Sequence, residues 1–313
     1  MCDLVIEGKP IEKLIEVVSK AIGVVYEPRQ MVRMAKAEAE AERIKAIEHA
    51  KTEALIAGDE AKVNELSLIE KRIVAKEEKR KKNIEKVIGV ATQTIKDEAY
   101  VSTEPVNLDW ATRFFDIVQD ISDEQMQDLW GRILAGEVKR PHSYSLRTLE
   151  VLRNITSEEA QLFERIAQYV MFDRNHFIYY DSSLKDYNIE MTYEDIAKLI
   201  EIGFLQAGSS VQANLHNNQG EVVKNAIAYG NYIVLIDQPP VHPIVSFSVF
   251  PLTKTGSELF RLLTITSNEN YLKCFANSLK KRYGKLVIQY ADLKYVDYEK
   301  NEYVYDEETI KNL

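Results

Sequence analysis

Residues 122–153 decide the fold of the central part of the chain: SDEQMQDLWGRILAGEVKRPHSYSLRTLEVLR. Ser122 and Gln125 have the spacing of a capping box, which marks the start of a helix. Apolar side chains then recur at three- and four-residue steps, as on one helix face, at Met126, Leu129, Trp130, Ile133 and Leu134. We therefore predict that Leu129, Trp130 and Leu134 are structural core residues, and that the Trp130 N–H reaches a polar partner at the edge of the core.

The surrounding sequence extends this helix into a helical bundle over residues 100–172. Gly136 and Pro141 are expected to end the helix, and Ser145 is expected to cap a second one. Another helix precedes them, and a fourth begins with a Thr-x-x-Glu capping box at Thr156. Four helices with short connections are typical of a bundle.

The stretch from Pro28 to Lys96 is rich in Ala, Glu, Lys and Ile, which favour helix. Gly58 and Asp59 place a C-cap glycine beside an N-cap aspartate, which predicts two antiparallel helices, the first starting at Pro28. Apolar residues keep helical spacing in both arms: Met31, Met34, Ala37, Ala41, Ile44 and Ile47, then Val63, Leu66, Ile69, Ile73, Ile84, Val87 and Ile88. The polar run 76–83 cannot be buried continuously. We therefore expect a hairpin or coiled coil that projects or meets another subunit.

Residues 11–26 form an amphipathic pattern, and its apolar side is expected to be buried against another surface. Its apolar side carries Ile11, Leu14, Ile15, Val18, Ile22 and Val25. Packing in a core or against a subunit is one interpretation, and peripheral contact with a membrane surface is the other. The polar side mixes acidic and basic residues, whereas helices that bind anionic lipid are rich in Lys and Arg.

After residue 172 the sequence changes to β-branched and aromatic runs at 176–181, 232–237 and 244–250, which predict strands. A helix capped by Thr192 and ended by Gly203 comes between the first and second runs, and LTKTGSELFRLL follows the third. This order resembles winged-helix domains. In those domains the corresponding helix enters the DNA groove, but here it carries Glu194, Asp195, Lys198 and Glu201, so DNA reading is not favoured.

The predicted fold class is α+β, mostly α, with an N-terminal helical hairpin or coiled coil, a central helical bundle and a C-terminal winged-helix-like domain. Residues 285–296 alternate like an edge strand. The last residues are acidic and rich in tyrosine, and they are expected to form a mobile tail or to dock on a neighbour. The predicted domains are 1–99 for oligomerisation, 100–172, 173–291 and the tail 292–313.

Length, charge and cysteine content restrict the class of protein. The 313 residues are 45% hydrophobic, which is enough for two or three units with their own cores. A net charge of -9 argues against a surface built entirely for nucleic acid. Cys2 and Cys274 cannot form a disulfide framework, and neither a leader nor a membrane-spanning run is expected, so the sequence predicts a cytoplasmic protein.

Sequence motifs for catalysis, cofactors or metals are not found. The five histidines, His49, His142, His176, His216 and His242, lack the spacing of a zinc motif. Gly-rich phosphate loops and the Gly-x-Ser-x-Gly elbow are missing. Asp237 ends an apolar strand as a nuclease carboxylate would, but a Gln-Pro-Pro turn follows it. We therefore predict no catalytic, cofactor-binding or metal-binding residues and favour a protein that is not an enzyme.

Two basic clusters are candidates for anion or nucleic-acid contact. The first is Lys71, Arg72, Lys76, Lys79, Arg80, Lys81 and Lys82, interleaved with glutamates. It is either a solvated helix with internal ion pairs or a site for phosphate or a partner. The second flanks the start of a predicted helix and contains Lys139, Arg140 and Arg147.

Four segments together resemble a known family: residues 26–47, 123–137, 140–152 and 156–163. They look like a bacterial family described only as a domain of unknown function, number 2806 in that series, over most of the chain. The Leu129-Trp130 and Leu134-Ala135 pairs with the Ser-rich helix start are also similar to the abortive-infection alpha proteins, which are linked to phage resistance. A packed helix face requires such residues in any case, so this second likeness implies shared structure before shared function.

Three functions follow as hypotheses. The first is a scaffold or sensor that self-associates through the hairpin and binds protein partners, in bacterial antiphage defence. The second is a nucleic-acid-binding regulator that uses the winged-helix-like domain. The third is an unrecognised enzyme such as a nuclease.

Overall fold

A computed structural model describes the backbone of residues 10–22, 26–27, 30–31, 35–298 and 300–313, and side chains for residues 10–22, 43–298 and 300–313. The described residues combine helices with an antiparallel sheet, which confirms the α+β class. The chain divides into two compact units, residues 1–153 (unit 1) and 154–313 (unit 2). Among the described helices, none has both the length and the apolar character needed to cross a membrane.

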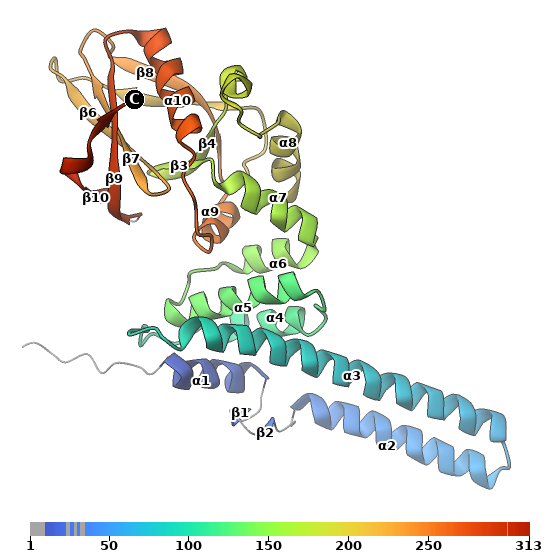
Figure 1. The fold of residues 1–313 in the computed structure, drawn as a ribbon. Coiled ribbons are helices and arrows are strands. Elements are labelled where there is room, and N and C mark those ends of the chain that lie inside the picture. Colours follow the sequence, from blue (N-terminus) through green and yellow to red (C-terminus); the bar gives the residue numbers. More distant parts are fainter. Residues whose placement is uncertain (1–9, 23–25, 28–29, 32–34, 299) are drawn as a thin grey trace, which may run out of the picture. The chain divides into compact units, whose positions relative to one another are not determined.

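Unit 1 is helical apart from one small sheet (Figure 1). Its elements are α1 Pro10–Ile22, β1 Tyr26–Glu27, β2 Gln30–Met31, α2 Ala35–Ile56, α3 Glu60–Ile95, α4 Leu108–Val118, α5 Glu124–Lys139 and α6 Leu146–Asn154, whose last residue belongs to unit 2. Helices α2 and α3 form the predicted hairpin. The turn between them is as expected, because Gly58 has a φ of 71° and the Asp59 carboxylate accepts a hydrogen bond from the Lys62 N–H at 3.0 Å.

The predicted start of the hairpin at Pro28 is wrong. Gln30 and Met31 pair with Tyr26 and Glu27 in an extended ladder, and α2 begins only at Ala35. Pro28, Val25 and Met34 lie outside the described residues, as do the side chains of Met31, Ala37 and Ala41.

Helix α5 begins one residue later than predicted. Asp123 is its N-cap, and its carboxylate accepts from the Met126 N–H at 2.9 Å. The Ser122 hydroxyl instead accepts a hydrogen bond from Asn83. The capping box predicted for Ser122 is therefore wrong, because the helix starts one residue later and Asp123 caps it through the Met126 N–H.

Gly136 lies inside α5 and does not end it, which is also a correction. The helix continues to Lys139, and the Tyr144 ring packs on Gly136 so closely that a Cβ there would lie 2.7 Å from the Tyr144 hydroxyl. Pro141 follows the helix end, as expected. The Ser145 hydroxyl accepts from the Thr148 N–H at 3.3 Å at the start of α6, as predicted.

The core of unit 1 lies between α5 and the C-terminal third of α3. Trp130 and Leu134 are fully buried, whereas Leu129 is only half-buried. The Trp130 ring meets Phe114 edge to face at 5.4 Å. Its N–H is buried and has no hydrogen-bond partner among the described residues, so the predicted polar partner is not found there. Close packing of the two helices requires Gly131, where a Cβ would lie 2.4 Å from that of Val90.

Helix α1 covers part of the same core. Its residues Leu14, Val17 and Val18 are buried, and the helix packs on α4 and α5. The apolar face of α1 is therefore buried, at least in part, within its own unit.

Unit 2 is built on a nine-stranded antiparallel sheet in the described residues, with the order β10-β9-β7-β6-β3-β4-β8-β5 and β11 paired to β9. The strands are β3 Val170–Asp173, β4 Asn175–Tyr179, β5 Val211–His216, β6 Val223–Tyr229, β7 Tyr232–Gln238, β8 Ile244–Pro251, β9 Val287–Asp297, β10 Glu302–Tyr305 and β11 Lys311–Asn312. The helices are α7 Ser157–Ala167, η1 Ser182–Tyr187, α8 Tyr193–Ile202, α9 Lys254–Phe260, α10 Glu269–Tyr283 and η2 Glu307–Thr309. Helix α7, which the sequence groups with the bundle, instead packs on α8, so unit 2 starts before residue 172.

The described residues of the segment 292–313, all except 299, are folded, which contradicts the first of the two expectations, a mobile tail. They continue β9 and form β10, η2 and β11, and β9 pairs with β7 on one side and with β10 and β11 on the other. The predicted edge strand is therefore an interior strand. Apolar Tyr303, Tyr305 and Ile310 pack against the buried Ile233 and Leu235, which offsets the cost of ordering this segment.

The structure does not confirm the winged-helix resemblance. Helix α8 ends at Gly203, whose φ is 90°, and β5, β6, β7, β8 and α9 follow in that order. Their strands join the large sheet, so the pattern is one corner of a larger domain.

His176 on β4 is buried in an aromatic cluster. Its ring lies 4.9 Å from those of Phe172 and Phe260 and 5.2 Å from that of Tyr298. Its Nε2 has no hydrogen-bond partner among the described residues. Burial, assisted by the nearby Arg261, lowers the pKa of His176 from 6.5 to about 4.

The stability of unit 2 should therefore fall in acid. Between pH 6.5 and 4 the unfolded chain binds a proton at His176 that the folded chain excludes, so stability decreases as the pH falls through this window, by up to about 1.4 kcal/mol per pH unit. His176→Phe should remove this part of the pH dependence, as measured by urea unfolding followed by tyrosine circular dichroism. His216→Gln, at an exposed histidine, is the control. Parallel pH profiles for the two variants would contradict the assignment.

Candidate interaction surface on the helical hairpin

Helix α3 has two different environments along its 36 residues. Near its C-terminus Val87, Ile88, Ala91 and Ile95 are buried in the core of unit 1. The N-terminal part of the helix extends away from α1, α4 and α5 and packs on α2 (Figure 1). The first basic cluster, residues 71–82, begins on this outer part and ends beside Asn83, where α3 contacts the connection between α4 and α5.

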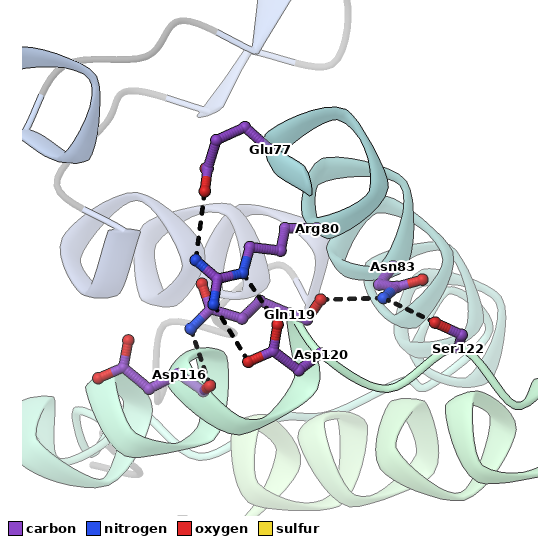
Figure 2. A network of polar contacts seen from close by, with 7 residues as sticks. All are labelled: Glu77, Arg80, Asn83, Asp116, Gln119, Asp120 and Ser122. Carbon is purple, nitrogen blue, oxygen red and sulfur yellow. Dashed lines mark hydrogen bonds and ion pairs between the residues drawn. The ribbon is translucent and has the colours of Figure 1, made fainter. Parts of the chain in front are cut away.

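Asn83 holds the helix at the point where the two environments meet (Figure 2). Its side-chain N–H₂ donates to the Gln119 carbonyl at 2.9 Å and to the Ser122 hydroxyl at 3.3 Å. Its amide oxygen accepts from Gln127 at 3.2 Å, and Gln127 also donates to the Ile121 carbonyl. Asn83 is 5% exposed and uses both its donors and its acceptor, so it fixes α3 against the connection between α4 and α5.

Arg80, one turn before Asn83, adds an ion pair to the same connection. Its guanidinium donates to both carboxylate oxygens of Asp120, at 2.9 and 3.3 Å, and to Glu77 at 3.2 Å (Figure 2). The hydrogen bond to Asp120 raises the pKa of Arg80. Lys81 pairs with Glu85 at 3.6 Å. These two members of the predicted cluster are therefore engaged within the protein.

The other five cations of the cluster are exposed and have no ion-pair or hydrogen-bond partner among the described residues: Lys71, Arg72, Lys76, Lys79 and Lys82. At about 100° per residue they span an arc of about 140° around the helix axis. The side chains that face α2, including Leu66 and Ile73, lie on the opposite side. The structure thus gathers five cations on one surface, which we call the cationic face.

The contact between α2 and α3 is incompletely buried in the outer hairpin. The apolar residues along it are only half-buried: Ile44, Ile47, Val63, Leu66 and Ile73. Leu55, Ile56, Ile69 and Val74 are exposed, with Ile56 at 83% and Leu55 at 64%. Two helices alone do not remove this apolar surface from water.

The second basic cluster is partly engaged within the protein. Lys139 pairs with Glu98 at 2.7 Å, and Arg147 is exposed on α6. The buried carboxylate of Glu137 accepts the backbone N–H groups of His142 and Tyr144 at 2.7 and 3.0 Å. Burial raises the pKa of Glu137, and these hydrogen bonds oppose the rise. The backbone N–H groups of the loop after α5 therefore already bind a carboxylate of the protein, that of Glu137.

Groups suited to catalysis or metal binding are not found elsewhere in the described residues. No group of three or more His, Cys, Asp and Glu side chains could hold a metal ion there. Cys274 is buried, and burial raises the pKa of its thiol, so it is not an activated nucleophile. Asp237 is partly buried at the end of β7, opposite Lys224 on β6.

Sequence reasoning missed Asn83 and Glu137. As charged or polar residue types, both look like surface positions. Asn83 carries no local signal, since its partners are 36 or more residues away. The partners of Glu137 are local, at five and seven residues, but they are backbone N–H groups, which side-chain patterns do not reveal. Helical phase offers one clue, because Asn83 precedes the buried Val87 by four residues.

Residues 68–276 match a family described as "Protein of unknown function (DUF2806)". The chain belongs to this family. The match starts within the outer half of α3 and ends in α10, so it includes the cationic face and Asn83. Comparisons with curated proteins and with solved structures gave no match.

The role of Asn83 can be tested by truncation. Asn83→Ala should lower the free energy of unfolding of unit 1 by about 1–3 kcal/mol, because it removes one hydrogen bond each from the Gln119 carbonyl and the Gln127 side chain in a buried site. Both tryptophans lie in unit 1, so urea unfolding followed by their fluorescence reports on it. Asn64→Ala on the same helix removes an exposed side chain and is the matched control. Equal midpoints for the two variants would show that the contact contributes nothing.

Proposed function

We propose that this protein is a non-catalytic scaffold that self-associates through the α2–α3 hairpin. The observation that carries the proposal is the apolar surface left open along the outer hairpin. Leu55 and Ile56 near the tip, with Ile69 and Val74 on α3, expose large apolar side chains to water. Covering such a surface is favourable by about 25 cal/mol per Å².

A second copy of the chain is the occupant that fits this surface best. An identical hairpin supplies two helices of the same length, and four antiparallel helices bury a seam that two leave half open. A two-fold axis makes the same patch self-complementary. The charges of the outer hairpin are also compatible with a second copy. Acidic and basic residues alternate along both helices, and Lys51 of α2 pairs with Glu70 of α3.

The proposal further places this scaffold in the bacterial cytoplasm, in antiphage defence. Support for that setting comes from the resemblance of residues 122–153 to the abortive-infection alpha proteins and from the low cysteine content. The scaffold class itself is supported by the hairpin.

Reading of DNA by the winged-helix-like part of unit 2 has less support. Helix α8 exposes Glu194 and Glu201, and its Lys198 pairs with Glu194 at 2.9 Å. Asp195 is held by Arg165 at 2.7 Å. An acidic helix repels phosphates, so α8 is a poor recognition helix.

Light scattering on purified protein tests the proposed scaffold. The monomer mass is 36.0 kDa, and we expect a larger mass at micromolar concentration. The double variant Leu55→Lys with Ile69→Lys places two charges on the open seam and should give a monomer that still folds, because both side chains are exposed.

The matched control is Val222→Lys with Val241→Lys, which changes two valines of unit 2 that are each 58% exposed. It should keep the oligomeric mass. A monomeric parent protein, or an oligomer that survives the hairpin substitutions, rules out self-association through this surface.

A further inference from the structure

The cationic face is an unexplained concentration of charge in an acidic protein. Its members Lys71, Arg72, Lys76, Lys79 and Lys82 occupy about 16 Å of helix, at 1.5 Å per residue. Ionic neighbours are available on the same helix, as Arg80 and Lys81 show, yet the structure gives these five no ion pair among the described residues. We propose that this face binds the phosphate backbone of duplex DNA, independently of base sequence.

The angle that the cationic face spans around the helix favours a ligand with a groove over a ligand with a flat surface. Lys71 and Lys76 mark its two limits, about 140° apart around the helix. A plane touches only the middle of such an arc. The major groove of B-form DNA is about 12 Å wide and admits an α-helix, so side chains at both limits reach phosphates on opposite walls.

The position of the face on the hairpin leaves it free for such docking. Helix α2 packs on the opposite side of α3, and the outer part of the hairpin extends beyond the helices of the unit 1 core (Figure 1), while Lys79 and Lys82 lie next to Arg80 and Asn83 at the junction with that core. The net charge of -9 acts weakly here, since charges further away than about 10 Å are largely screened at 0.1 M salt. Glu78 lies at the margin of the face, next to Lys82 by helical spacing, and reduces the local charge without interrupting the stripe.

The residue types on the face predict contact with phosphates and little reading of bases. Four of the five are lysines, which bind phosphate as point charges, and aromatic side chains for stacking on bases are missing from residues 64–86. Among the described residues, this face carries one large apolar side chain, the exposed Leu68. A helix lying in a membrane interface needs a continuous apolar face, so an anionic membrane is the poorer fit.

Fluorescence anisotropy with two unrelated 20-base-pair DNA duplexes tests the proposal. We expect both to bind with similar affinity at 50 mM salt and to weaken steeply at 200 mM. The variant Lys71→Gln, Lys79→Gln, Lys82→Gln should lose at least about tenfold in affinity, and its plot of log K against log salt should be less steep by about 2 to 3. Light scattering shows separately whether it still assembles.

The control variant Lys185→Gln, Lys224→Gln, Lys281→Gln makes the same charge change at three exposed lysines of unit 2 and should bind like the parent. Absence of binding at 50 mM salt, or equal loss in both variants, would overturn the proposal. Tighter binding of an RNA duplex would also overturn it, because the A-form major groove is too narrow for a helix. So would binding to vesicles with 30% phosphatidylserine in the absence of binding to DNA.

Discussion

The burial of one polar side chain, Asn83, determines how the rest of unit 1 is arranged. A buried amide must pair all of its polar atoms, and Asn83 does so only when α3 meets the α4–α5 connection at one register. Beyond this point toward the C-terminus, α3 is a core helix that buries Val87 and Ile88. Before it, the same helix is an arm supported by α2 alone. The Arg80–Asp120 ion pair strengthens the junction from the exposed side, where such pairs contribute less than about 1 kcal/mol.

The arm therefore presents two surfaces with different chemistry. Its seam with α2 leaves apolar residues such as Leu55 and Ile69 exposed, and the cationic face lies beside it on α3. The two surfaces meet at one margin, because Ile69 and Lys76 are seven residues apart on the same side of the helix, whereas Lys71, Lys79 and Lys82 lie about 80° or more away from Ile69. A scaffold assembled through the seam would present several cationic faces together, and multivalent binding strengthens a weak contact with a polymer.

Local and periodic signals predicted part of this structure. The turn at Gly58 and the apolar face around Trp130 were predictable, because backbone conformation and helical spacing are properties of adjacent residues. The role of Asn83 depends on partners from other elements, the carboxylate of Glu137 is bound by the backbone of the loop after its helix, and the order of the described residues in 292–313 depends on pairing with β7 and β9. Arg80 and Lys82 belong to one cluster in the sequence because both are basic. Only the fold shows that Arg80 pairs with Asp120, whereas Lys82 is exposed and has no ion pair among the described residues.

Hydrogen–deuterium exchange, resolved by peptide and repeated at low and high protein concentration, tests the central claim that the outer hairpin is an assembly arm fixed at Asn83. In the dilute monomer we predict slow exchange for residues 84–95 and faster exchange for residues 60–76, because only the former are held in the core of unit 1. Raising the concentration should slow exchange in residues 43–76 and leave residues 84–95 unchanged. Uniform protection along α3, or concentration-dependent protection confined to unit 2, would contradict this account.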